Sequence, residues 1–383
     1  MSKYEQLIID SEVEEFDQDE TKDLEQEISD LKEPFDPKDI EIQVLQTTMS
    51  TLITRLDNNE IDLSPDFQRT ADLWRNELKG RLIESLFIRL PLPAFYFDAT
   101  NDEHWQVVDG LQRLTTIKRF VLEKGNKKLA LKGLEFMRDY EGAFYDDLPR
   151  TLQRRINEAP VTLYLIKPAT PKEVKYSLFY RINTGGLTLN AQEIRHALSQ
   201  STNEGKASKF LKSLTETDVF KKVVRAPDKR MLDKELVLRF CAFKITSFNN
   251  YKSPMIKFLN STMDSLGEDL TENQLRQLSE SFEGSLLLSG ELFGKDAFRK
   301  SLVDKDKNKV LNRALFEVIT VLFSSLTKEH QEKLLANKSE FLDDFKKLMS
   351  SDYFFAAISY STTDTENVKY RFNCILELIN KFS

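Results

Sequence analysis

The apolar positions of the chain change their spacing along its length. Short alternating or β-branched runs predict strands in the first half, and apolar residues three or four positions apart predict amphipathic helices. From about residue 208 to the end the helical spacing is continuous. The expected strands cover residues 94–97, 105–109 and 160–166, and the expected helices of the first half cover 43–56, 75–87, 111–125, 151–157 and 173–183. The chain is therefore predicted to be an α+β protein, with a small sheet and helices followed by an all-α helical bundle.

Residues 107–117 carry the strongest candidate chemistry, because they combine a strand end, Gly110 and a helix start. A helix start presents free backbone N–H groups at the positive end of the helix dipole, which favours phosphate. Arg113 adds a forked cationic donor, and Asp109 adds a carboxylate that suits Mg²⁺ or an attacking water. The alternative is a plain strand-to-helix connection, with Asp109 capping the helix and Arg113 solvated.

Asp109-Gly-Leu-Gln-Arg113 resembles the DGQQR motif of the GmrSD-type restriction endonuclease N-terminal domain family. Further stretches fit that family in the expected order over roughly residues 40 to 200. They are Pro65-Asp-Phe-Gln-Arg69 with Trp74, Leu90-Pro-Leu-Pro93, Phe179-Tyr-Arg-Ile-Asn-Thr-Gly-Gly186, Leu189 and Gln192-Glu-Ile-Arg195. Leu111 departs from the pattern, because it stands where the motif has its first glutamine, and this removes one polar group.

The resemblance implies a ParB/sulfiredoxin-like domain at residues 40–205, which we expect to precede an α-helical domain at 206–383. It also implies a site for a nucleoside triphosphate, with Asp109, Gln112 and Arg113 as the catalytic residues and Asp109 as the ligand of Mg²⁺. The expected phosphate-binding residues are Arg69, Gly110, Gln112, Arg113, Arg181, Asn183, Gly185, Gly186 and Arg195. The alternative to phosphate binding for Arg69, Arg181 and Arg195 is ordinary ion pairing. For Asn183 and the glycines the alternative is helix capping and turn formation.

Charge is distributed unevenly along the chain. The net charge is −7, but residues 1–39 hold 15 acidic side chains and four lysines, so the remaining residues carry a net charge of +4. Residues 1–39 are predicted to be an acidic tail, either a frayed helix or a disordered segment. The tail either solubilises the protein or covers the mildly basic body, which permits contact with DNA without requiring it.

Several kinds of chemistry are disfavoured by the sequence. Cys241 and Cys374 lie in apolar helical patterns, which indicates free thiols in a cytoplasmic protein. The three histidines are isolated, and no apolar run reaches membrane-spanning length. Pro65-Asp66 with Glu77-Leu-Lys79 spells a PD…ExK nuclease pattern, but the second half falls in a helical pattern, so we interpret the match as coincidence.

Two classes of function follow from the resemblance. The first is a nucleotide-binding, NTP-hydrolysing regulatory or sensor subunit of a modification-dependent restriction or anti-phage system. Two-part relatives append an HNH-type nuclease that this sequence does not supply, so a separate nuclease or toxin subunit is the expected partner. The second is a non-catalytic, ParB-like DNA- or protein-binding module that restrains such a partner. An oligomer formed through the helical C-terminal half is a further expectation.

Overall fold

The computed structural model describes residues 40–63, 74–182, 190–200, 205–226, 229–303 and 310–382. The chain divides into two compact units, and the division falls between Leu189 and Asn190. The unit within residues 33–189 is called the sheet unit below, and the unit within residues 190–383 is called the helical unit. The predicted acidic tail at 1–39 lies outside the described residues.

The sheet unit is built on a mixed five-stranded sheet with the strand order β1-β5-β3-β4-β2. β1 pairs with β5 and β3 with β4 in antiparallel fashion, whereas β3 with β5 and β2 with β4 are parallel. The strands are β1 Ile42–Thr48, β2 Ile61–Asp62, β3 Phe95–Asp98, β4 Trp105–Asp109 and β5 Pro160–Ile166. The helices are α2 Met49–Asp57, α4 Asn76–Phe87, α5 Leu111–Val121, α6 Arg150–Asn157 and α7 Lys172–Ile182. The α+β class and the strands expected from the sequence are thus confirmed.

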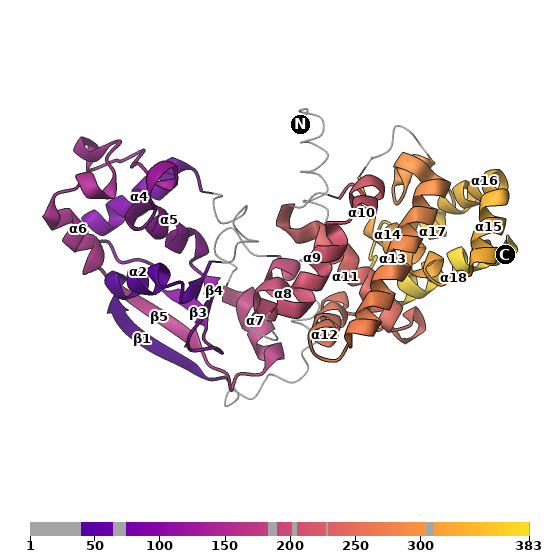
Figure 1. Cartoon of the computed structure of the whole chain (residues 1–383), viewed down its shortest axis with the longest axis horizontal. Helices are drawn as coiled ribbons and strands as arrows, with labels where there is room; N and C mark the ends of the chain where they lie inside the picture. The colour runs from indigo at the N-terminus through magenta and orange to yellow at the C-terminus, as the bar shows by residue number, and fades with distance from the viewer. Residues whose placement is uncertain are drawn as a thin grey trace. The chain divides into compact units, whose positions relative to one another are not determined.

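One face of the sheet forms the core of this unit. Phe95 and Phe97 of β3 and Leu163 and Leu165 of β5 alternate with residues that point the other way, as strand geometry requires. These four residues belong to one hydrophobic cluster with buried residues of α2, α4, α5 and α6, and Figure 1 shows those helices together on one side of the sheet. The opposite face carries a different set of side chains.

The helix predicted at 43–56 is wrong in its first half. Residues 42–48 form strand β1, and the helix begins only at Met49. The helical spacing of Leu45 and Met49 is coincidental, because Leu45 lies opposite Leu163 of β5 and the whole of β1 pairs with that strand. Strand pairing over such a distance in the sequence overrides a local pattern.

Helix α7 packs near β4 and is fixed by a buried ion pair. The Lys175 ammonium lies 3.2 Å from Asp98 Oδ1 at the end of β3, and both side chains are almost fully buried. Thr100 closes the arrangement, since its backbone N–H and its hydroxyl both donate to Asp98 Oδ1. This contact positions the segment that ends just before the predicted Asn-Thr-Gly-Gly stretch, which itself lies outside the described residues.

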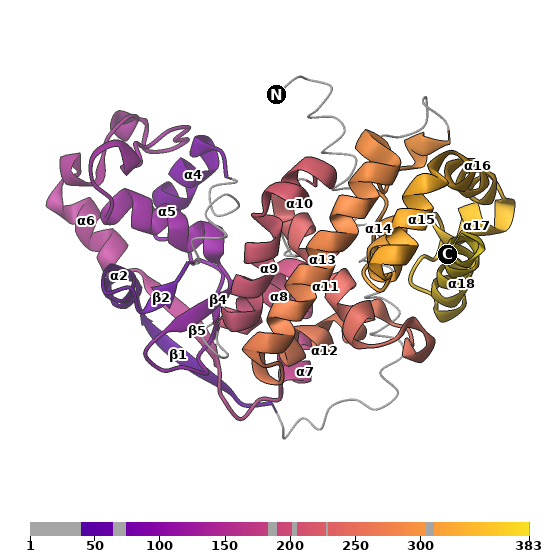
Figure 2. The ribbon, with the colours of Figure 1, turned by 45° about the vertical axis from the view of Figure 1, so that its right-hand side comes forward.

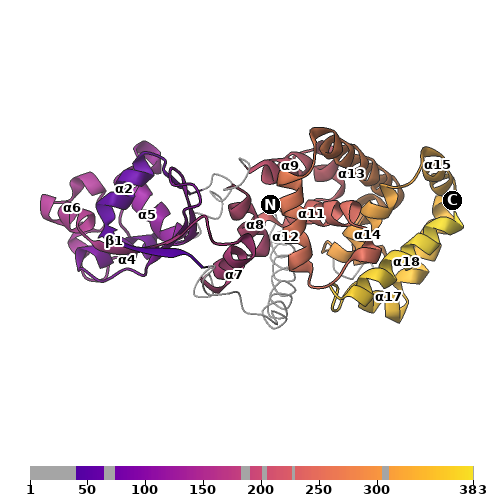
Figure 3. The same cartoon turned by 90° about the horizontal axis from the view of Figure 1, so that it is seen from below.

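The helical unit contains no strand among its described residues, in agreement with the continuous helical spacing of the sequence. Its helices are α8 Ala191–Gln200, α9 Lys206–Thr215, α10 Asp218–Val223, α11 Leu232–Ile245, α12 Met255–Glu268, α13 Glu272–Phe293, α14 Arg313–Phe323, α15 Lys328–Ala336, α16 Lys338–Met349, α17 Asp352–Ala357 and α18 Thr365–Lys381. Helix α14 contacts α11, α13 and α18 (Figure 2), and α17 packs on α18 (Figure 3). Of the helices described, none combines the length and apolar character needed to span a membrane.

A buried ionic network crosses the core of the helical unit. Arg239 of α11 donates to Glu235 and to Glu317 of α14, and the carboxylate of Glu317 also accepts from Arg371 of α18. Arg313 lies 3.4 Å from Glu235 and completes the set. Because charges removed from water are costly unless they are paired, this network ties α11, α14 and α18 to one arrangement.

Candidate functional site

The turn between β4 and α5 has the geometry that the sequence predicted. Gly110 has φ +102° and ψ 9°, a conformation that L-residues with a side chain rarely adopt. A Cβ atom at this position would also lie 2.5 Å from Cδ1 of Phe95, so the β3 strand leaves no room for one. Helix α5 begins directly after this glycine, and no acidic side chain lies in its first turn.

Arg113 is buried and holds this turn together. Its guanidinium donates to the carbonyl oxygens of Pro93 and Ala94 and, at 2.7 Å, to Oδ2 of Asp109. The guanidinium carbon also lies 4.6 Å from the centre of the Phe95 ring. Burial lowers the pKa of Arg113, and the charge of Asp109 partly offsets that effect. The interpretation of Arg113 as a solvated side chain is therefore wrong.

Asp109 is the part of the turn that faces solvent. Its side chain is 36% exposed, and one of its oxygens, Oδ2, accepts from Arg113. Asp109 precedes the glycine and does not cap α5, so the capping interpretation is also wrong. Gln112 lies half-buried in the first turn of α5, where its carbonyl accepts from Thr116. The arrangement offers a fixed carboxylate beside the positive end of a helix dipole.

A β-bulge determines what lies beside Asp109. Phe97 pairs with Val107, but the register then shifts, and Tyr96 pairs with Asp109 instead of Val108. Bulges insert one residue into a strand and redirect the side chains near it. Tyr96 also pairs with Tyr164 of β5, so Asp109, Tyr96 and Tyr164 form one row across the face of the sheet opposite the core. No local sequence pattern points to either tyrosine, because only the strand register brings them to the motif.

The other predicted site residues fall into three groups. Arg69, Asn183, Gly185 and Gly186 lie outside the described residues, and Arg181 lies in α7 with a side chain that is not described. Gly110, Gln112 and Arg113 lie together at the start of α5 with Asp109. Arg195 belongs to the helical unit, where it is 1% exposed and its Nε donates to Gln192 at 2.9 Å.

Helix α8, which carries Arg195, begins with two reciprocal contacts between Asn190 and Glu193. The backbone N–H of Glu193 donates to the Asn190 side chain at 2.9 Å, and the Glu193 carboxylate accepts from the Asn190 backbone N–H at 2.8 Å. This reciprocal pair is a capping box. Arg195 Nη1 lies 3.4 Å from the side-chain oxygen of Asn260 in α12.

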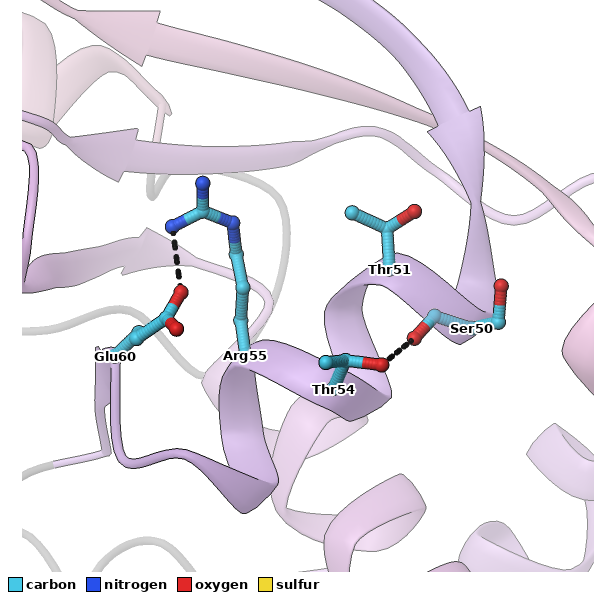
Figure 4. A pocket seen from close by; sticks show the side chains of 5 residues that line it. All are labelled: Ser50, Thr51, Thr54, Arg55 and Glu60. Carbon is cyan, nitrogen blue, oxygen red and sulfur yellow. Dashed lines mark hydrogen bonds and ion pairs between the residues drawn. The ribbon is translucent and has the colours of Figure 1, made fainter.

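Two surface hollows lie away from the turn. The first has a volume of about 370 Å³ and is lined by residues of α2 and by Glu60. Figure 4 shows that its charged groups are paired with each other, since Arg55 contacts Glu60 at 3.0 Å, and the Thr54 hydroxyl donates to the Ser50 carbonyl. The second hollow, about 550 Å³, lies between α9 and α13 and is lined by Lys206, Lys209 and Arg276 among others.

Metal-ligating side chains are not clustered in the part of the chain that the structure describes. No group of three or more His, Cys, Asp or Glu residues there could hold a metal ion. His104 is exposed in the sheet unit, His196 is buried in α8, and His330 lies in α15. The Glu77-Leu-Lys79 half of the nuclease pattern lies in helix α4, as expected for a coincidental match.

The sheet unit and its turn define a class of domain. It has a small mixed sheet with a layer of helices on one face. One strand ends at an aspartate, and a glycine and a helix with an arginine in its first turn follow it. Residues 49–200 match the family described as GmrSD restriction endonuclease, N-terminal domain. This match agrees with the resemblance that the motifs of the sequence carry, and the matched range includes α8. No curated protein and no solved structure matches the chain.

Proposed function

We propose that this protein is a nucleotide-binding, NTP-hydrolysing regulatory or sensor subunit of a modification-dependent restriction or anti-phage system, and that it acts with a separate nuclease. The restriction context follows from the family of residues 49–200. The observation that carries the nucleotide proposal is the Asp109 carboxylate, half-exposed and held by Arg113 beside the start of α5.

The chemistry of the turn suits a triphosphate. Phosphoryl transfer depends mainly on positioning and on stabilising negative charge. The N-terminal turn of α5 contributes the positive end of its dipole, which favours an anion. The role of Arg113 is to orient Asp109, since its guanidinium already donates to two carbonyls and to that carboxylate.

The residues present fit a Mg²⁺ ion bound together with phosphates. Mg²⁺ commonly uses one or two carboxylates with substrate phosphates and waters, and Asp109 supplies one carboxylate. The ion would supply charge neutralisation at the phosphates. Asp109 would hold it through the oxygen that does not accept from Arg113, while the α5 amides hold a phosphate oxygen.

The test is phosphate release by the purified chain with Mg²⁺ and each of the four NTPs, with and without duplex DNA. We expect hydrolysis of at least one NTP, and a loss of at least tenfold in Asp109→Asn. Asp102→Asn is the matched control, because Asp102 is an exposed aspartate of the same unit that only approaches Lys167 at 3.4 Å. Wild-type activity in Asp109→Asn, or no binding of any NTP by the wild type, would refute the proposal.

Two observations favour the second class, a non-catalytic module that binds DNA or a partner protein. The Arg113 guanidinium is committed to structural contacts, and Leu111 replaces a polar residue of the motif. Such a module predicts a DNA mobility shift, or binding of a nuclease or toxin, that does not respond to nucleotide. A shift that depends on NTP and Mg²⁺ favours the sensor.

A further inference from the structure

The face of the sheet opposite the core carries a row of side chains that ends at Asp109. Helix α7 covers part of this face, because its Lys175 pairs with the buried Asp98, two positions after Tyr96. Val44 of β1 pairs with Tyr164 of β5, Tyr164 with Tyr96 of β3, and Tyr96 with Asp109 of β4. Figure 1 shows β1, β5, β3 and β4 side by side. The neighbours of the two tyrosines along their strands, such as Phe95 and Leu163, point into the core on the other face. The row therefore lies on the face that α2, α4, α5 and α6 do not cover.

The two tyrosine rings are stacked on each other. Their centroids are 4.7 Å apart, with an angle of 11° between the ring planes. This separation equals the spacing of neighbouring strands, so the rings stand on the sheet with their flat faces directed along the row. One flat face of Tyr96 consequently looks toward Asp109. Both rings are half-buried, and Val44 at the far end of the row is 55% exposed.

The Tyr96 ring and the Asp109 carboxylate are close enough to influence each other electrically. The pKa of Tyr96 is raised, first by burial and then by Tyr164 and by the negative charge of Asp109. Asp109 has a much shorter side chain than Tyr96, so the outer part of the Tyr96 ring extends beyond the carboxylate. A flat group can lie against that part of the ring and reach the start of α5.

We propose that Tyr96 and Tyr164 form a stacking surface for the nucleobase of the nucleotide whose phosphates bind at Asp109 and the start of α5. This inference rests on the proposed function. Every nucleobase has a flat π face, and stacking on an aromatic side chain is worth an appreciable share of nucleotide affinity. The bulge in β4 couples the two parts of the site, because without it Val108 would lie opposite Tyr96.

The test compares two ligands that share phosphates and differ in the base. An NTP and inorganic tripolyphosphate, each with Mg²⁺, are titrated by calorimetry into the wild type, Tyr96→Leu and Tyr164→Leu. We expect the leucine variants to bind the NTP about 5- to 100-fold more weakly, which corresponds to the loss of one stacking contact. Tripolyphosphate should bind all three proteins equally.

Two controls separate stacking from other effects. Tyr96→Phe keeps the ring and removes the hydroxyl, so its NTP affinity should stay within about twofold of the wild type. Tyr353→Leu removes a tyrosine that is 81% exposed in the helical unit and should change nothing. Thermal melts followed by tryptophan fluorescence confirm that each variant is folded. Tyr164→Leu is a second test of stacking that leaves Tyr96, the residue paired with Asp109, unchanged.

The outcomes are distinguishable. If the wild type binds the NTP and both leucine variants bind it equally well, the stacking inference is wrong while the proposed function stands. If the leucine variants lose tripolyphosphate in the same proportion as the NTP, the tyrosines act through Asp109 and stacking is again refuted. If the wild type binds neither ligand, the proposed function fails and the inference falls with it.

Discussion

Replacing Arg113 with alanine should destabilise the sheet unit strongly, because this side chain joins three parts of the fold. The Arg113 side chain is 10% exposed, and its guanidinium donates to the carbonyls of Pro93 and Ala94 and to the Asp109 carboxylate. An acceptor that loses its donor costs about 1–3 kcal/mol where water cannot replace that donor, and the contact with the Phe95 ring adds about 0.5–1 kcal/mol. Water can replace the donor at the half-exposed Asp109 and in part at the exposed Pro93, so we expect a total loss of about 2–5 kcal/mol.

Tryptophan fluorescence during urea unfolding measures this loss selectively. The two tryptophans of the chain, Trp74 and Trp105, both belong to the sheet unit, so their emission reports on its unfolding. The expected loss corresponds to a melting temperature lower by roughly 5–15 °C. Arg113→Lys should be destabilised as well, because an ammonium cannot reproduce the forked contacts of a guanidinium.

Lys118→Ala is the matched control, because it removes a cation from the same helix α5 at a half-exposed position. Its unfolding free energy should remain within about 0.5 kcal/mol of the wild type. An Arg113→Ala protein as stable as this control would contradict the structural role of Arg113. The guanidinium would then be available to a phosphate, as the motif alone suggests.

Three further predictions concern other parts of the chain. Gly110→Ala should lower the unfolding free energy by about 2–4 kcal/mol in urea titration, because the added Cβ meets Phe95 in a strained backbone conformation; unchanged stability would contradict this. Burial raises the pKa of the Cys241 thiol to about 12, and burial also raises that of Cys374. Only the thiolate reacts with Ellman's reagent, so at pH 8 the reagent should modify Cys374 slowly, and the rate should increase with pH. Cys241 should react only after unfolding. Rapid modification of Cys241 in the native protein would be inconsistent with this. Glu317→Gln should cost the helical unit about 3–5 kcal/mol, because the buried Arg371 loses its charged partner and the buried Arg239 loses one of two. An unchanged circular-dichroism unfolding midpoint would refute this.

Local features of the fold were predictable from the sequence. The strand, glycine and helix at residues 105–121 depend on residues close together in the chain, and the structure has them as expected. The Asn190 and Glu193 pair at the start of α8 is equally local, because its contacts span three positions. Strand β1 was mistaken for a helix because its pairing partner lies more than 100 residues away.

The candidate site depends on contacts that no local pattern contains. Arg113 was identified by its motif, but its carbonyl partners come from Pro93 and Ala94, about twenty positions earlier. Tyr96 and Tyr164 are separated by 68 positions and meet only through the parallel pairing of β3 and β5. The alternation of side chains along β5 predicts that Tyr164 points away from the core. It does not predict that Tyr96 lies beside Tyr164.

Hydrogen–deuterium exchange tests the location of the nucleotide site most directly. The wild-type chain is exchanged with and without an NTP and Mg²⁺, and peptides covering the chain are compared by mass spectrometry. We predict slower exchange at the start of α5 and at the ends of β3 and β5 that carry Tyr96 and Tyr164, and no such change in Asp109→Asn. Protection that is absent from residues 107–117, or confined to the helical unit, would contradict the account.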